Sequence, residues 1–420
     1  MITLLSNGGT EGPMESKQAV SLPQPSPPAI AHRDERTLVS AWSFGAPRSL
    51  LVALAGIFFL LALACNLLII VASVPDARGI VLGGLAALIP TLVYAGLVLS
   101  FDRYEREPWQ NLLGAFGWGA VIATLFSILL SGAARGVLIA VLGDQIGGRV
   151  ALTVGAPIIE ESLKGLALLL LLLLYRNEFD GVLDGLIYGA LIGLGFALTE
   201  NILYLGRAYI DGGIGEFGQL FLAREAFGGL GHALYTGTTG AAVGWARARY
   251  GRGTLRFVVP VGGWGLAVAQ HSLWNFGAAT LADFSGGTPP FLDLVAIQTT
   301  LFIIPGLILL FVIARRSGHA ESGILRAQLA DEVAKGTLTA EEYAILSASR
   351  QRHRSLLAAF RHGGLRRWSL QQQFFQAAAE LALCKHHDVQ GEAPAVDDCP
   401  PEEIHRARLA VLRDALAAGH

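Results

Sequence analysis

Eight apolar stretches, each about long enough to cross a lipid bilayer, dominate the sequence between residues 49 and 314. A transmembrane helix needs roughly 20 predominantly apolar residues. Only 15% of the chain is charged, whereas soluble domains carry about a quarter. The stretches are 49–73, 80–100, 112–141, 152–175, 183–205, 223–245, 256–278 and 292–314. The sequence therefore predicts an all-α, polytopic membrane helix bundle with about eight transmembrane helices.

The segments on either side of these stretches differ in composition from them and from each other. Residues 1–48 contain four closely spaced prolines among Ser, Gln and Gly, a composition typical of disordered tails. In residues 315–420 charge returns, and Thr339 followed by Glu342 has the pattern of a helix capping box. We therefore expect a disordered tail (1–48), a transmembrane domain (49–314) and a soluble helical C-terminal extension (315–420).

The arginines between the stretches predict the orientation of the chain in the cell membrane. Cytoplasmic loops of membrane proteins carry an excess of Lys and Arg. If both termini are cytoplasmic, the cytoplasmic set is Arg33, Arg36, Arg48, Arg103, Arg106, Arg176, Arg247, Arg249, Arg252, Arg256, Arg315 and Arg316, and the opposite set is only Arg78, Arg149, Arg207 and Arg224. The bias favours a multi-pass protein with both termini in the cytoplasm.

Ionisable and amide side chains lie inside four of the apolar stretches, although each ionisable group costs roughly 2.5–3.5 kcal/mol to insert into a bilayer. At 1.5 Å rise per residue, Glu160 lies about 12 Å and Glu200 about 8 Å from the outer ends of their stretches. His232 and His271 fall at a similar depth in the next two. The set is Glu160, Glu161, Lys164, Glu200, Asn201, His232, His271 and Asn275. Four antiparallel helices would thus place their polar groups in one layer, in the outer half of the membrane.

Small residues share helix faces with several of these polar groups. Residues four apart lie on the same face of a helix, and small residues there let two helices approach closely. One such stripe runs through Gly185, Gly189 and Gly193, and another passes from His232 to Gly240. We therefore expect the polar groups to face neighbouring helices, not lipid.

Several of the polar groups, taken alone, have a purely structural explanation, although Glu161 and Glu200 are left unexplained. Glu160 and Lys164 have the spacing of an i,i+4 ion pair. His232 or His271 could each simply make an interhelical hydrogen bond, with Asn275 as further polar contact. Three carboxylates, one lysine, two histidines and two asparagines at one depth exceed what a structural bundle needs, so their convergence favours a functional site.

Two kinds of hydrolytic chemistry suit this constellation. A buried glutamate beside another acid could act as a general base toward water, with histidine and asparagine donors stabilising the oxyanion. Alternatively, two histidines and a glutamate could hold Zn²⁺ with an open coordination position. The metal-ligand candidates are His232, His271, Glu160 and Glu200. No His-Glu-x-x-His motif is present, so the zincin helix is excluded.

Four ordered motifs in about residues 80–315 resemble the PrsW family of intramembrane proteases, which are relatives of the CAAX prenyl proteases. They are Glu160-Glu161-Ser162-Leu163-Lys164, Phe196-Ala197-Leu198-Thr199-Glu200-Asn201, His232 within Gly231–Thr236, and His271-Ser272-Leu273-Trp274-Asn275. The segment Asp102–Trp109 also resembles a loop common in that family. A lone Glu-Glu-x-x-Lys would be a weak signal, whereas four motifs in order are specific.

The resemblance implies proteolysis of membrane-anchored substrates, such as anti-sigma factors, within the lipid bilayer. It implies that Glu160 or Glu161 activates water and that His232, His271 and Asn275 assist. Lys164, Glu200 and Asn201 would support them. The family has been described both as glutamic-type and as metalloprotease-like, so a zinc cofactor stays open. No nucleic-acid partner is implied, and the oligomeric state is left open.

Two other function classes remain open on the sequence alone. A proton- or cation-coupled transporter would use the same buried carboxylates, but we would expect an inverted repeat, and the sequence shows no strong internal symmetry. A non-catalytic membrane scaffold would use the polar layer to hold a peptide or a lipid. Ion flux in liposomes would separate a transporter from a protease.

Overall fold

The computed structural model describes residues 48–102, 107–175, 179, 181–248, 253–285, 290–390 and 400–418. Within these residues all regular secondary structure is helical, which confirms the predicted all-α class. The chain divides into two units, residues 1–54 and 55–420. The predicted disordered tail lies outside the described residues apart from Arg48, and so does the middle of the loop after Asp102.

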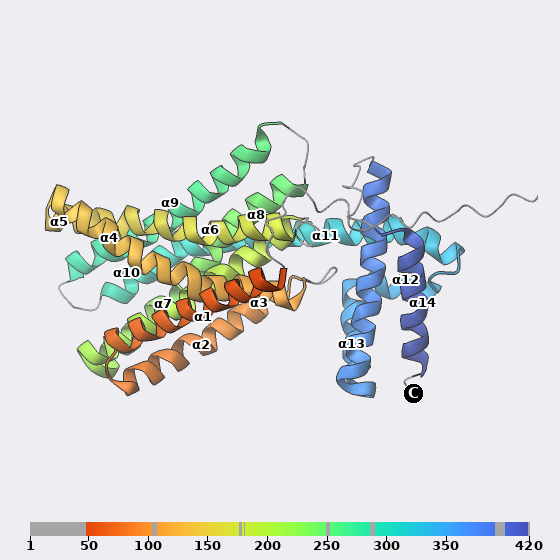
Figure 1. The fold of residues 1–420 in the computed structure, drawn as a ribbon, viewed down its shortest axis with the longest axis horizontal. Helices are drawn as coiled ribbons and strands as arrows, with labels where there is room; N and C mark the ends of the chain where they lie inside the picture. Colours follow the sequence, from red (N-terminus) through yellow and green to blue (C-terminus); the bar gives the residue numbers. More distant parts are fainter. Residues whose placement is uncertain are drawn as a thin grey trace, which may run out of the picture. The chain divides into compact units, whose positions relative to one another are not determined.

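Figure 1 shows the helices in chain order. They are α1 (Arg48–Ser73), α2 (Ala77–Leu99), α3 (Trp109–Gly117), α4 (Thr124–Leu142), α5 (Asp144–Val150), α6 (Ala156–Leu174), α7 (Val182–Phe221), α8 (Gly231–Ala248), α9 (Leu255–Ser285), α10 (Pro290–Gln298), α11 (Ile304–Ala334), α12 (Ala340–Leu346), α13 (Ser349–Gln390) and α14 (Glu402–Ala418). Wider π-helical turns at Trp118–Ala123, Ala151–Gly155, Leu222–Phe227 and Thr299–Ile303 precede α4, α6, α8 and α11.

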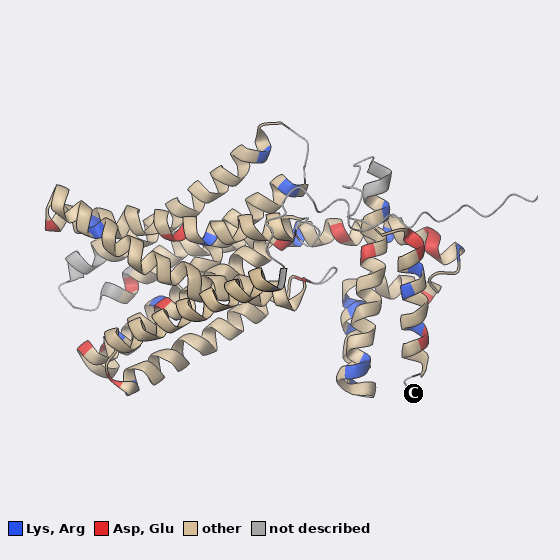
Figure 2. Cartoon of the chain, viewed as in Figure 1, with Lys and Arg blue, Asp and Glu red and all other residues tan. Residues whose placement is uncertain are grey.

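Seven of the eight predicted apolar stretches are helical, with or without a π-helical turn, whereas a turn at residues 228–230 interrupts the stretch 223–245. By length and hydropathy, five described stretches suffice to cross a membrane: Leu50–Ser73, Ala77–Leu99, Trp109–Leu142, Val182–Ala248 and Val295–Ala334. The chain is therefore a multi-pass membrane protein, while the number eight stays a prediction. Figure 2 shows charged residues to be sparse along α1–α10 and frequent on α12–α14.

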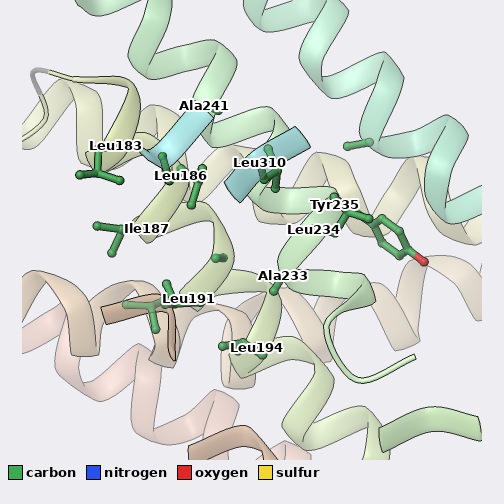
Figure 3. Close-up of a cluster of buried hydrophobic side chains, with 14 of the residues drawn as sticks. Leu183, Leu186, Ile187, Leu191, Leu194, Ala233, Leu234, Tyr235, Ala241 and Leu310 are labelled. Atoms are coloured by element: carbon green, nitrogen blue, oxygen red, sulfur yellow. The ribbon is translucent and has the colours of Figure 1, made fainter. Parts of the chain in front are cut away.

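Helices α7 and α8 form the centre of the membrane domain. Their buried side chains make one hydrophobic cluster with Leu310 of α11 (Figure 3). The predicted glycine stripes lie in this interface: a Cβ atom added to Gly193 would collide with the backbone of His232, and one added to Gly240 would collide with that of Gly185. Because the two backbones touch, His232 is held directly against α7.

Two helices run further than the apolar pattern predicts. Helix α7 reaches Phe221, beyond the predicted end at 205, with a break at Gly213, whose φ of 65° suits glycine. Helix α11 continues to Ala334, so the predicted boundary at 315 falls inside a helix. Its last turns lose the apolar run but keep buried Leu325 and Leu329, which pack in the core of the C-terminal helices.

The C-terminal helices α12–α14 and the end of α11 enclose a second hydrophobic cluster, which includes Phe374 and Leu409. The predicted capping box is confirmed, because the Thr339 hydroxyl accepts from the Glu342 amide at 3.1 Å and the Glu342 carboxylate accepts from the Thr339 amide at 2.8 Å. This part of the chain is thus helical, as predicted.

Candidate active site

Helix α6 carries three ionisable side chains within five residues. Lys164 and Glu161 are fully buried, and Lys164 Nζ lies 2.8 Å from Glu161 Oε1. The i,i+4 pair expected from spacing is longer, at 3.6 Å from Lys164 Nζ to Glu160 Oε2. The lysine therefore pairs mainly with Glu161, and its contact with Glu160 is the weaker of the two.

Glu161 joins three helices through both of its carboxylate oxygens. Oε1 accepts from Lys164 on its own helix and lies 3.1 Å from His271 Nδ1 on α9. Oε2 accepts from the Thr236 hydroxyl on α8 at 3.0 Å. Because a carboxylate only accepts, Nδ1 of His271 carries the proton, and Nε2 of that ring offers a lone pair.

Glu160 is buried, but its Oε2 has no hydrogen-bond partner. Its nearest charged or titratable neighbours are Lys164 Nζ at 3.6 Å and His271 Nε2 at 3.8 Å. A buried polar atom without a partner is costly and uncommon, so this oxygen is the group in the cluster that is available to a proton or a cation. Two lone pairs, on Glu160 Oε2 and His271 Nε2, thus face each other.

His232 on α8 completes the cluster from the other side. Its Nδ1 lies 3.0 Å from Lys164 Nζ and its Nε2 lies 3.0 Å from Glu200 Oε2. Because an ammonium group only donates, Nδ1 is the acceptor and Nε2–H donates to Glu200. The rings of His232 and His271 meet edge to face, with centroids 5.0 Å apart.

The Glu200 carboxylate is in turn held by Arg224, from the π-helical turn before α8, with Nη2 at 2.6 Å from Oε2. Arg224 Nε also donates to Asn201 at 2.6 Å, and the Asn201 amide donates to Glu225 at 2.7 Å. Sequence reasoning missed Arg224 as a site residue and counted it only toward topology. The signal was an Arg-Glu pair inside the predicted 223–245 stretch.

The structure brings together all the predicted site side chains except Asn275, which donates to the Leu152 carbonyl at 3.0 Å. Among the described residues no hydrogen bond joins the Asn275 side chain to the cluster, so its catalytic role stays a prediction. The others are linked by the hydrogen bonds and ion pairs given above: Glu160, Glu161, Lys164, Glu200, Asn201, His232 and His271.

Three of the four predicted metal-ligand candidates lie close enough to share one ion. Glu160, His232 and His271 each offer one ligand atom, and these atoms lie within 4.8 Å of one another. Glu200 is absent from this group and instead binds His232 and Arg224. Zinc in proteins takes nitrogen and oxygen ligands at about 2 Å. The Glu160 oxygen makes no hydrogen bond and lies 3.8 Å from His271 Nε2, so these two atoms fit a zinc site, whereas His232 Nδ1 is engaged by Lys164.

A small cavity of about 20 Å³ adjoins His232. Its lining also includes Asn201, Arg224, Gly228, Tyr235 and Trp274. A cavity needs roughly 10–15 Å³ to hold one water molecule with polar partners. The cavity therefore has room for a water molecule beside His232, although neither Glu160 nor His271 lines it.

Comparison with known proteins finds similarity within the apolar part of the chain. The profile of a family described as PrsW family intramembrane metalloprotease matches residues 107–310. Protease PrsW of Clostridioides difficile strain 630 is 33% identical over 121 residues, which cover 29% of this chain and 49% of the relative. Protease PrsW of Bacillus subtilis strain 168 is 33% identical over 128 residues, which cover 30% of this chain and 53% of the relative. The chain thus spans about half the length of these curated relatives. No solved structure matches the chain.

Proposed function

We propose that the chain, whose residues 107–310 belong to the PrsW family of intramembrane metalloproteases, is an endopeptidase that cuts membrane-anchored proteins within the bilayer. The observation that carries the proposal is a buried Glu160 oxygen that makes no hydrogen bond, on a carboxylate grouped with two histidines whose ligand atoms lie within 4.8 Å of one another. The substrates would be single-span proteins of the anti-sigma-factor kind. We place the enzyme in the cell membrane with both termini in the cytoplasm.

The side chains divide into reacting and positioning groups. Glu160 Oε2 is the atom that takes a proton from water or binds a cation, because both Glu161 oxygens are already engaged. Glu161 fixes the tautomer of His271, and Glu200 fixes that of His232, in the way that outer carboxylates orient histidine ligands. Lys164 supplies positive charge beside His232 Nδ1.

Glu160 and His271 would hold the zinc ion that the family implies, and His232 would join them by exchanging the hydrogen bond that its Nδ1 accepts from Lys164 for the ion. A bound Zn²⁺ would supply Lewis-acid polarisation of the scissile carbonyl. The chain's own residues exclude bulk water: Glu160, Glu161, Lys164 and His271 are all buried. Tyr235 stacks on His271 with ring centroids 5.0 Å apart, which restricts rotation of that ring.

We expect the purified chain, reconstituted in liposomes with a membrane-anchored single-span reporter, to cleave it, and a zinc chelator to stop cleavage. His271→Ala removes both a candidate ligand and a proton carrier, so its cleavage rate should fall at least about 100-fold. Elemental analysis should show less zinc per polypeptide in this variant than in the wild type.

Two outcomes would contradict the proposal in different ways. Equal cleavage by the wild type and His271→Ala would remove the protease assignment of this site. If His271→Ala lost cleavage while the wild type contained no zinc and was insensitive to the chelator, the protease assignment would stand and the zinc assignment would be wrong.

Arg224 is expected to act as a positioning residue for Glu200 and His232. Arg224→Gln breaks a two-point contact, and loss of outer partners of histidine ligands typically costs 10–100-fold in activity or metal affinity, so we expect kcat to fall by that order with little change in KM. Arg224→Lys should retain only part of the wild-type kcat, because a lysine cannot bind Glu200 and Asn201 with one planar group. Arg207→Gln, at an exposed arginine on α7, is the matched control. An unchanged kcat in Arg224→Gln would reject the role.

A further inference from the structure

The first part of α13 carries a concentration of positive charge that the membrane site does not use. The 37 residues from 343 to 379 contain no aspartate or glutamate. They contain six arginines and two histidines: Arg350, Arg352, Arg354, Arg361, Arg366, Arg367, His353 and His362. A break at Gly363–Gly364, where Gly364 has a φ of 61°, divides α13, and Arg366 and Arg367 lie just beyond it.

Most of these basic side chains are exposed, whereas Arg352 is buried and lies over the ring of Phe375. Arg350, Arg354 and Arg361 recur at a spacing that places them on one side of the helix, and all are exposed. In the described part of the chain, none of these three pairs with a carboxylate. By contrast, Arg408 and Arg413 of α14 bind Glu380 and Glu342, both at under 3 Å.

Large apolar side chains are exposed among these arginines. Leu357 is 41% exposed, Phe360 is 48% exposed and Leu365, just after the break, is 72% exposed. Ala359, on the same helix, is buried. A helix that presents arginines together with exposed leucine and phenylalanine has the composition of helices that lie in a membrane interface.

The basic segment borders the end of a membrane helix. A cavity of about 500 Å³ is lined by Leu99 and Ser100 at the end of α2, and by side chains from the start of α13. The charged or titratable lining residues are Asp102, Arg350, Arg352, His353 and Arg354. The apolar stretch of α2 ends at Leu99, so this cavity lies where lipid headgroups would begin. Its charge is predominantly positive, which complements phosphate.

We propose that the first part of α13 and this cavity bind the headgroups of anionic phospholipids in the same membrane. Arg350, Arg354 and Arg361 would contact lipid phosphates, while Leu357 and Phe360 enter the boundary with the acyl chains. The predicted orientation puts this surface on the cytoplasmic side, where anionic lipids attract basic segments. The inference does not depend on the proposed protease activity.

The test is hydrogen exchange of the full chain in nanodiscs of phosphatidylcholine alone or mixed with phosphatidylglycerol. We expect residues 349–367 to exchange more slowly with phosphatidylglycerol, and high salt to weaken this effect. Each surface arginine contributes about fivefold to binding, so Arg354→Gln with Arg361→Gln should reduce the slowing by up to about 25-fold. The matched control is Arg78→Gln with Arg207→Gln, which removes the same amount of charge at two exposed arginines elsewhere. This variant should leave the slowing of exchange in residues 349–367 unchanged.

Exchange in α14 reports whether each variant keeps the C-terminal helices folded, and we expect it to be unaffected throughout. Equal exchange of residues 349–367 in both kinds of nanodisc would overturn the proposal. So would unchanged slowing in the Arg354→Gln, Arg361→Gln variant. If slowing instead requires an added acidic peptide in phosphatidylcholine discs, the surface binds acidic protein segments and the lipid assignment is wrong.

Discussion

Replacing Glu160 by glutamine is expected to lower the rate of reporter cleavage by about 10²–10⁴-fold, the range for loss of a general base, while the chain still folds. Glutamine has nearly the same shape as glutamate, and Glu160 Oε2 makes no hydrogen bond that the change would break. The measurement is single-turnover cleavage of a membrane-anchored reporter by the reconstituted chain, with thermal unfolding of the same sample.

Glu216→Gln is the matched control for this prediction, because Glu216 is an exposed carboxylate on α7 outside the site. It should cleave at the wild-type rate. If Glu160→Gln also cleaves within a few-fold of the wild type, Glu160 is not the reacting group. The role would then pass to Glu161, which the sequence alone could not distinguish from it.

The sequence could predict the gathering of the site because depth and small-residue stripes both constrain it. Glu200 and His232 lie on different helices, and the glycine stripes predicted that the polar faces of these helices pack against other helices. The structure packs the two helices against each other and places the two side chains 3.0 Å apart. Asn275 shares a face with His271 in the sequence pattern, but its amide reaches the Leu152 carbonyl instead. Helical spacing gives a face, whereas the partner of a side chain depends on which helix packs there.

The sequence could not separate the roles of Glu160 and Glu161. The two are adjacent in the chain, and their difference comes from the rotation of α6 relative to α8 and α9, which turns Glu161 toward Thr236 and His271. Arg224 was missed for a related reason. It lies at the edge of an apolar stretch, where an arginine is normally a topology signal, and only the π-helical turn before α8 brings it to Glu200.

The apolar pattern could not predict where α7 and α11 end. Hydropathy locates the part of a helix that lies in lipid. The apolar pattern ends at the membrane boundary even where the helix continues. Helix α7 continues past residue 205, and α11 continues past 314 into a part that packs Leu325 and Leu329 against other C-terminal helices. Neither continuation requires an apolar run, so neither leaves one in the sequence.

Lys164→Met is expected to destabilise the folded chain by about 3–5 kcal/mol, because it leaves Glu161 fully buried without its ammonium partner. Glu161→Gln should cost a similar amount, since Lys164 would keep only Glu160 at 3.6 Å and His232 at 3.0 Å. The measurement is the free energy of unfolding in mixed micelles as denaturing detergent is added. Both variants should also lose cleavage, so the free energy of unfolding, and not the cleavage rate, decides this test.

The double variant Glu161→Gln, Lys164→Met should cost much less than the two single changes added together. Replacing a whole buried ion pair by neutral residues is often close to neutral, whereas removing one partner strands a charge, and the shortfall from additivity measures the coupling. The exposed pair Arg207–Asp211, with its arginine 60% exposed and its charges 2.8 Å apart, is the matched control. Arg207→Met there should cost under about 1 kcal/mol. Additive costs at Glu161 and Lys164 would mean that the two charges are not paired in the folded protein, and Glu161 would then lose its role as the fixed partner of His271.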